Sequence, residues 1–176
     1  MLLYSAQLAW TVLRALTTPK IGVLEPSRLS MRVWPTDLDT NLHMNNGRYL
    51  TLMDYGRIDM VARNGLGRAV MKNRWSPVLA SAFIRFRRPL RPFQRYTLVT
   101  RIVCWDERWV VMEQRFESGD KVLAQAFVRG TFLEKGKTVP TTTLLEALGV
   151  TMPSPPMPEV VARWVSAEEA ARNSAA

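Results

Sequence analysis

Four stretches in the second half of the chain have the composition and alternation of β-strands. They span residues 75–89, 95–105, 108–117 and 121–134. Only Asp106-Glu107 and Ser118-Gly119-Asp120 separate the last three, and such short breaks are typical of tight turns between paired strands. This half of the chain therefore predicts an antiparallel meander.

A single long helix is expected just before these strands. Its first apolar face consists of residues three or four positions apart, namely Tyr49, Leu52, Met53, Gly56 and Met60. A second stripe adds Leu50, Ile58 and Val61, so the helix should be largely buried. Asparagines 45 and 46 are good N-caps, and the Asn64-Gly65 pair with Gly67 is expected to end the helix.

The order of these segments places the chain in the α+β class. A short strand is expected at 28–33, before the helix, and short helices at 144–148 and 159–172, after the strands. We predict a curved antiparallel sheet wrapped around one central helix. The expected organisation is an N-terminal helix (1–21), the main domain (22–150), and a Pro-rich linker with a short C-terminal helix (151–176).

The N-terminal segment is an apolar helix with several conceivable roles. One stripe holds Leu2, Ala6, Ala9, Leu13 and Leu16, with Trp10 beside it. At 1.5 Å per residue, a seventeen-residue helix reaches roughly 25 Å, which is short for a bilayer span. Docking on the domain or on a partner is expected, with peripheral membrane contact through residues 1–18 as the alternative. No signal-peptide pattern is evident and Cys104 is the only cysteine, so a cytoplasmic protein, with or without membrane association, is expected.

The loop before the long helix concentrates the reactive side chains. It runs from Asp37 to Tyr49 and contains the only histidine of the chain. The free N–H groups of a helix start favour a carboxylate or an oxyanion. One histidine and one cysteine argue against a zinc site, and the loop lacks the glycine and glutamate of a calcium loop, with Leu42 and Arg48 in their places. Nucleophile elbows, phosphate loops and dinucleotide fingerprints are also missing, so no metal or organic cofactor is expected.

The same loop carries a family resemblance. The pattern Asp37-Leu38-Asp39-x-Asn41-x-His43-Met44-Asn45-Asn46-x-x-Tyr49 resembles the D-x-D-x-x-x-H-[VM]-N-N-x-x-Y signature of hotdog-fold thioesterases. Within them, the chain is similar to the 4-hydroxybenzoyl-CoA thioesterase-like group, which includes acyl-CoA and acyl-carrier-protein thioesterases. A looser likeness extends over about 26–149. It implies a hotdog fold, hydrolysis of acyl thioesters carried by CoA or a carrier protein, with acyl-CoA expected first, and a homodimer or dimer of dimers.

The resemblance also assigns roles to single residues. It places the catalytic carboxylate at Asp39, which would activate a water or attack the thioester carbonyl itself. His43 and Asn41 are expected to polarise the carbonyl or orient the water, with backbone N–H groups of the helix start holding the oxyanion. At the helix start, Asn46 and Tyr49 are expected to border the bound substrate. Asp37 is expected to order the loop.

Arginines gather in the strand and loop that follow the helix. The chain has a net charge of +9, and Arg85, Arg87, Arg88 and Arg91 are candidates for the phosphates of a coenzyme. The same residues could equally serve as a solubilising strand edge. Phe86, on the apolar side of this strand, is expected in the core. An alternative function is a non-catalytic hotdog module that binds acyl chains or an anionic membrane, whereas no nucleic-acid motif accompanies the charge.

Overall fold

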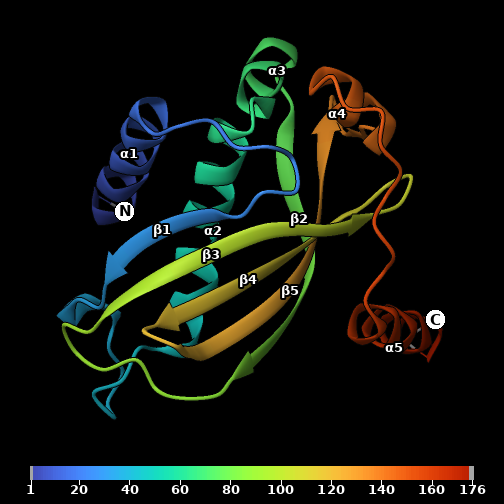
Figure 1. Ribbon diagram of the computed structural model, residues 1–176. Coiled ribbons are helices and arrows are strands. Elements are labelled where there is room, and N and C mark those ends of the chain that lie inside the picture. The colour runs from blue at the N-terminus through green and yellow to red at the C-terminus, as the bar shows by residue number, and fades with distance from the viewer. Residues whose placement is uncertain (1, 175–176) are drawn as a thin grey trace.

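The computed structural model describes residues 2–174, with side chains from residue 7 onward. Its helices are α1 (Leu2–Thr17), α2 (Asn46–Arg63), α3 (Leu66–Asn73), α4 (Thr141–Ala147) and α5 (Glu159–Ser174). Its strands are β1 (Ser27–Arg32), β2 (Ser76–Phe86), β3 (Arg95–Trp105), β4 (Val110–Ser118), β5 (Lys121–Glu134) and β6 (Lys137–Thr138). The strands form one antiparallel sheet in the order β1-β3-β4-β5-β2, with β6 beside β5, and β3-β4-β5 is the expected meander (Figure 1).

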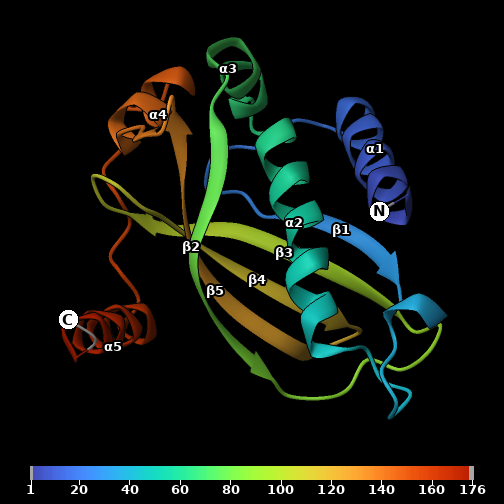
Figure 2. The same ribbon diagram turned by 180° about the vertical axis from the view of Figure 1, so that it is seen from behind.

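The curved sheet holds α2 against one face, as the sequence predicts (Figures 1 and 2). Leu52, Met53 and Met60 of the first apolar stripe are at most 2% exposed and pack with residues of β3, β4 and β5. At Gly56 the helix comes so close to the sheet that an added Cβ would overlap the Thr100 hydroxyl. A side chain at this position would push α2 off the sheet, so glycine is required here for packing.

The second stripe of α2 is less buried than expected. Ile58 and Val61 are partly buried, but Leu50 is 40% exposed. Phe86, expected in the core, is 42% exposed although its ring contacts that of Tyr49. Both deviations have one cause: β2 is the last strand of the sheet on this side, so no further strand covers the flank of α2 next to it.

The α3 helix was not expected from the sequence. Gly65 ends α2 and, with φ of 95°, turns the chain into the eight residues of α3. Leu66 at its start is buried against Trp75, Val139 and Leu144. These residues form a small second cluster that joins α3 and α4 at one end of the sheet.

The N-terminal helix packs on α2 through a different face from the predicted stripe. Thr11 and Ala15 are buried, whereas Leu13 and Leu16 are 64% and 66% exposed and Trp10 is 52% exposed. An ion pair explains this difference. Arg14 lies 2.8 Å from the buried Asp59 of α2, and this contact fixes the rotation of α1 about its axis. Within residues 2–174, no helix combines the length and hydrophobicity needed to cross a membrane.

The C-terminal helix covers the opposite face of the sheet. Val161 is fully buried among residues of β3, β4 and β5, and Cys104 lies in the same cluster, as its strand pattern predicts. Arg129 pairs with Glu168 at 2.8 Å, and the Trp105 N–H donates to Ser154 Oγ at 2.8 Å, which ties down the Pro-rich linker. Burial raises the pKa of the Cys104 thiol, and nearby Asp106 adds to this effect.

Candidate active site

We call the loop from Asp37 to Tyr49 the motif loop. Its first part is a compact turn built around Asp39. The Asn41 and His43 N–H groups donate to Asp39 Oδ1 at 2.8 and 3.3 Å, and the Asp39 N–H donates to the His43 carbonyl at 2.9 Å. Asp39 and His43 are both half-buried, whereas Asn41 is exposed. The turn therefore holds the carboxylate by backbone donors at the base of α2, with one of its oxygens taken up by these donors.

Asp37 ties the loop to the helix that follows. Its side chain is buried, and Oδ1 accepts from Arg48 Nε and Nη2 at 3.0 and 2.8 Å. Its Oδ2 accepts from the Trp34 N–H at 2.8 Å, and its carbonyl accepts from the Asn45 N–H. The expectation that Asp37 orders the loop is confirmed. Arg48, read in the sequence only as a missing calcium ligand, is its partner.

We expect Arg48→Ala to loosen the motif loop. The change leaves the buried Asp37 carboxylate without its two charged hydrogen bonds, which should lower the free energy of unfolding by about 2 kcal/mol. Chemical denaturation followed by tryptophan fluorescence measures this loss, and hydrogen exchange at residues 37–45 should accelerate. A matched change at an exposed arginine, Arg172→Ala, should leave both readings unchanged. Equal stability of the two variants would show that the bidentate pair does not hold the loop.

The start of α2 faces this loop. Asn45 is the N-cap, and its Oδ1 accepts from the Gly47 N–H at 2.8 Å, as expected for one of the two asparagines. Asn46 is the first helical residue and is exposed. The helix start leaves backbone N–H groups near the loop, which suits a developing negative charge.

The end of β2 and the chain beyond it meet the motif loop. The Met44 N–H donates to the Leu90 carbonyl at 2.9 Å, and the Tyr49 ring lies 4.9 Å from that of Phe86. Tyr49 is buried, and burial raises the pKa of its hydroxyl, opposed by a hydrogen bond from the Leu90 backbone and reinforced by the Asp39 charge. Tyr49 therefore stays protonated at neutral pH, close enough to Asp39 to sense its charge.

The predicted arginines lie on the segment that meets the loop. The Arg87 and Arg88 N–H groups donate to the Leu123 carbonyl, which turns the chain away from the sheet after β2. The side chains of the four candidate phosphate-binding arginines are exposed: Arg85, Arg87, Arg88 and Arg91. Within the described residues, none of them forms an ion pair. They are thus placed at the same end of the molecule as the motif loop and are available to an anion.

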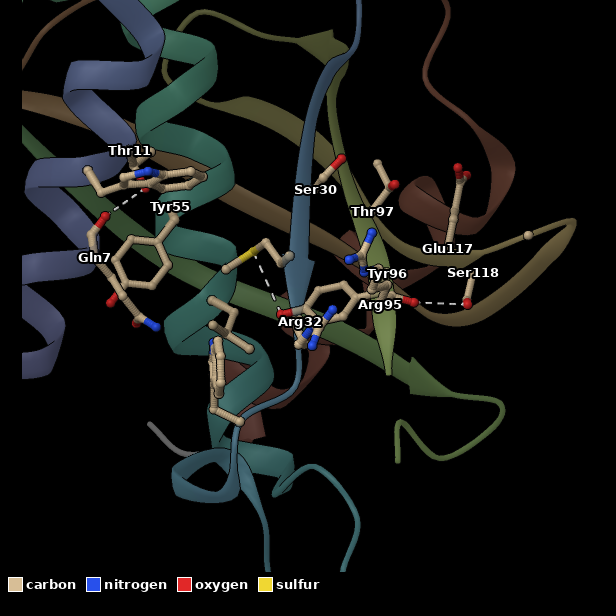
Figure 3. A pocket seen from close by; sticks show the side chains of 15 residues that line it. Gln7, Thr11, Ser30, Arg32, Tyr55, Arg95, Tyr96, Thr97, Glu117 and Ser118 are labelled. Carbon is tan, nitrogen blue, oxygen red and sulfur yellow. Dashed lines mark hydrogen bonds between the residues drawn. The ribbon is translucent and has the colours of Figure 1, made fainter. Parts of the chain in front are cut away.

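Two hollows border α2, and sequence patterns indicate neither. An apolar cavity of about 540 Å³ lies among α2, α3, α4 and the strands beside them, lined by residues such as Ile58, Val61, Leu79 and Met112. A groove of about 740 Å³ lies beside β1, with Gln7 and Thr11 of α1 and Tyr55 of α2 on one side of the strand (Figure 3). The side chains of Arg32, at the end of β1, and of Arg95, on β3, lie toward the other side of the groove. Side chains from distant parts of the sequence shape both hollows.

Comparison with known proteins places this chain in a family. A family model described as the thioesterase-like superfamily matches residues 33–165, which include the motif loop, α2 and the whole sheet after β1. Protein THEM6 of Xenopus laevis is 33% identical over 161 residues, which cover 89% of this chain and 76% of that protein. The matches to the Drosophila melanogaster and Danio rerio proteins of the same name span only 65% and 54% of those proteins.

Solved structures share the fold at low sequence identity. The probable thioesterase YbaW of Escherichia coli has a TM-score of 0.64 and 20% identity, covering 69% of this chain and 95% of that one. The protein SAV2348 of Staphylococcus aureus, solved in complex with CoA, has a TM-score of 0.63 and 12% identity, covering 80% and 94%. The chain belongs to the thioesterase-like superfamily, and its sheet wrapped around α2 is the hotdog fold.

Proposed function

We propose that the chain hydrolyses acyl thioesters at Asp39, with acyl-CoA as the substrate. The observation that carries this proposal is the placement of Asp39: a half-buried carboxylate, oriented by two backbone N–H groups, directly before the start of α2. Family membership supports thioester hydrolysis, and SAV2348, a structural neighbour, was solved with CoA.

The chemistry follows from the free oxygen of Asp39. The Asn41 and His43 N–H groups occupy Oδ1, which leaves Oδ2 to take a proton from water or to attack the thioester carbon itself. In both routes the carbonyl oxygen gains negative charge, which N–H groups at the start of α2 would stabilise, and the C–S bond breaks as the thiolate of CoA leaves. In the second route water then hydrolyses the acyl-Asp39 anhydride, which releases the fatty acid and restores the carboxylate. In this proposal His43 and Asn41 orient the carbonyl or the water, and Asn46 and Tyr49 border the reacting carbonyl.

The two ends of the substrate have different environments in this proposal. Arg85, Arg87, Arg88 and Arg91 are exposed near the motif loop and would bind the phosphates of CoA. The apolar cavity beside α2 would receive the acyl chain. The first residue of α2 that lines this cavity is Asp54, eight residues after Asn46, so the cavity begins roughly 12 Å along the helix from the motif loop. The polar site and the apolar cavity are thus arranged along the axis of α2.

Release of free CoA from thioesters of increasing acyl length tests this function. Each methylene buried in the cavity should lower KM about fourfold, because one CH₂ contributes about 0.8 kcal/mol, until the chain fills the space. The variant Gly130→Ala offers a control that reduces the space for the acyl chain. Its added Cβ would meet the Val78 carbonyl at 3.2 Å and Met112 Cε at 3.6 Å. The optimum should then shift to shorter chains. A KM independent of chain length would contradict the placement of the acyl group.

A homodimer formed through β2 is part of this proposal. Among the described strands β2 pairs only with β5, and all of its residues are at least partly exposed. Its exposed apolar side chains include Val78, Leu79, Phe83 and Phe86, at 37% to 42%. A long apolar edge strand is prone to pair with another chain. Pairing with the same strand of a second copy would also cover Leu50 and close the flank of α2 next to the cavity.

Leu79→Lys is expected to weaken this dimer by tenfold or more, because it places a charge at the apolar edge. Light scattering after size-exclusion chromatography should give twice the mass of one chain for the parent and a shift toward one chain for the variant. Leu13→Lys makes the same change at an exposed leucine of α1 and should leave the mass unchanged. A monomeric parent at micromolar concentration would refute the dimer.

A further inference from the structure

The end of the molecule that holds the motif loop also exposes large apolar side chains. Trp34, Leu42 and Phe93 are 48%, 65% and 56% exposed. They come from three short segments that backbone hydrogen bonds hold together. The Phe93 N–H donates to the Val33 carbonyl at 3.0 Å, and the Met44 N–H donates to the Leu90 carbonyl. Figure 1 shows these loops gathered beyond the ends of β1 and β3, at the base of α2. We refer to Trp34, Leu42 and Phe93 as the loop-tip patch.

The backbone is strained to display two of these residues. Leu42 and Phe93 have φ of 55° and 60°, a left-handed conformation that disfavours bulky side chains and is normally left to glycine or asparagine. The other non-glycine residues with positive φ in the described chain are Arg74, directly after α3, and Lys135, in the turn between β5 and β6, and both are polar. A hydrophobic side chain that is more than half exposed at such a position gains little from burial in the isolated fold. Its presence points to a partner.

Three arginines lie near the patch, on β1, on β3 and in the segment between β2 and β3. Arg32 and Arg95 are directly opposite each other in the β1–β3 register, an arrangement that is destabilising between like charges (Figure 3). Arg91 lies two residues before Phe93 and is exposed. In residues 2–174 none of these three arginines forms an ion pair. An anionic partner would relieve the repulsion between Arg32 and Arg95.

We propose that the loop-tip patch and its arginines dock on the surface of an anionic lipid bilayer. Trp34, Leu42 and Phe93 project from loop tips, so they can enter the headgroup region together while Arg32, Arg91 and Arg95 contact lipid phosphates. Of the three tips only Trp34 lines the groove beside β1, whereas Leu42 and Phe93 lie outside it, so a peptide held in that groove would not use the whole patch. This docking would turn the base of α2, with the motif loop, toward the membrane. It does not require the loop to perform catalysis, and of the arginines proposed for CoA it uses only Arg91.

Sedimentation of the full chain with vesicles tests this proposal. Vesicles of phosphatidylcholine with 30% phosphatidylserine, roughly the content of an anionic membrane surface, should bind the chain, and pure phosphatidylcholine should not. The double variant Leu42→Asn with Phe93→Asn should bind at least tenfold more weakly. Asparagine tolerates positive φ, so this variant should melt at or above the temperature of the parent. The triple variant Arg32→Ser, Arg91→Ser and Arg95→Ser should lose about a hundredfold, at roughly fivefold per arginine.

Two further variants guard the interpretation. Arg74→Asn with Lys135→Asn relieves the same backbone strain and removes two charges outside the patch, and it should bind vesicles like the parent within about threefold. A variant with Trp10, Leu13 and Leu16 replaced by serine tests α1, whose exposed residues offer a rival surface. Loss of binding only in this α1 variant would overturn the proposal. Absence of vesicle binding by the parent would also overturn it. The same holds if the parent binds an acidic polypeptide such as polyglutamate and does not bind vesicles.

Discussion

Asp59→Ala should lower the free energy of unfolding by about 3–5 kcal/mol, the cost of removing one partner from a buried ion pair. The Asp59 side chain is completely buried. It accepts from Arg14 at 2.8 Å, from Ser27 Oγ at 2.5 Å and from Arg63 at 3.2 Å. One carboxylate thus joins α1, β1 and α2. Its removal leaves two guanidinium groups with no counter-charge in a largely buried position.

Urea denaturation measures this effect, and Glu159→Ala provides the comparison. Glu159 pairs with Arg163 on the exposed side of α5, with both side chains more than three-quarters exposed, so its loss should not change stability measurably. Arg14→Ala should fall between the two, because Arg14 is 27% exposed and Asp59 keeps Ser27 and Arg63. If Asp59→Ala were as stable as Glu159→Ala, α1 would not be held by this carboxylate.

Asp39→Asn should reduce turnover of acyl-CoA by a factor of about 10² to 10⁴, the usual contribution of a general base, while keeping the loop intact. The amide oxygen of asparagine can still accept the Asn41 and His43 N–H groups that the carboxylate accepts now. What the amide cannot do is take a proton or form an anhydride. Thermal unfolding of the variant should therefore match the parent within about 3 °C, a shift that corresponds to about 1 kcal/mol.

Asp39→Ala separates the structural from the chemical role of this side chain. Alanine cannot accept the two N–H groups, so the loop should open and the free energy of unfolding should fall by about 1–2 kcal/mol. Turnover should be as low as in Asp39→Asn. Activity that follows stability, high in the asparagine variant and low in the alanine variant, would mean that Asp39 only shapes the loop.

The sequence predicts the main elements of the fold because their signals are local. Both β3 and β5 have the predicted bounds, and Asn45 caps α2 where an N-cap was expected. Alternation, turn residues and capping groups act over a few positions, so they can be read without tertiary structure. The Asp37 role was also foreseeable, since aspartate side chains commonly accept backbone N–H groups in turns.

The remaining features depend on which elements become neighbours. The exposed stripe of α1 was misassigned because Arg14 turns the helix toward Asp59, a residue 45 positions away. The exposure of Leu50 and Phe86 depends on β2 being an edge strand, which single-chain periodicity cannot reveal. Arg48 was missed as the partner of Asp37 because its bidentate geometry exists only after the loop has folded back. The apolar cavity is likewise formed by several elements at once.

The most direct test of the proposed function is the release of CoA thiol from long-chain acyl-CoA by the purified chain, measured side by side with Asp39→Asn at equal concentration and equal folded fraction. We expect steady turnover by the parent and a loss of about 10² or more in the variant. No thiol release by the parent at any acyl length, or the same rate in both proteins, would contradict catalysis at Asp39.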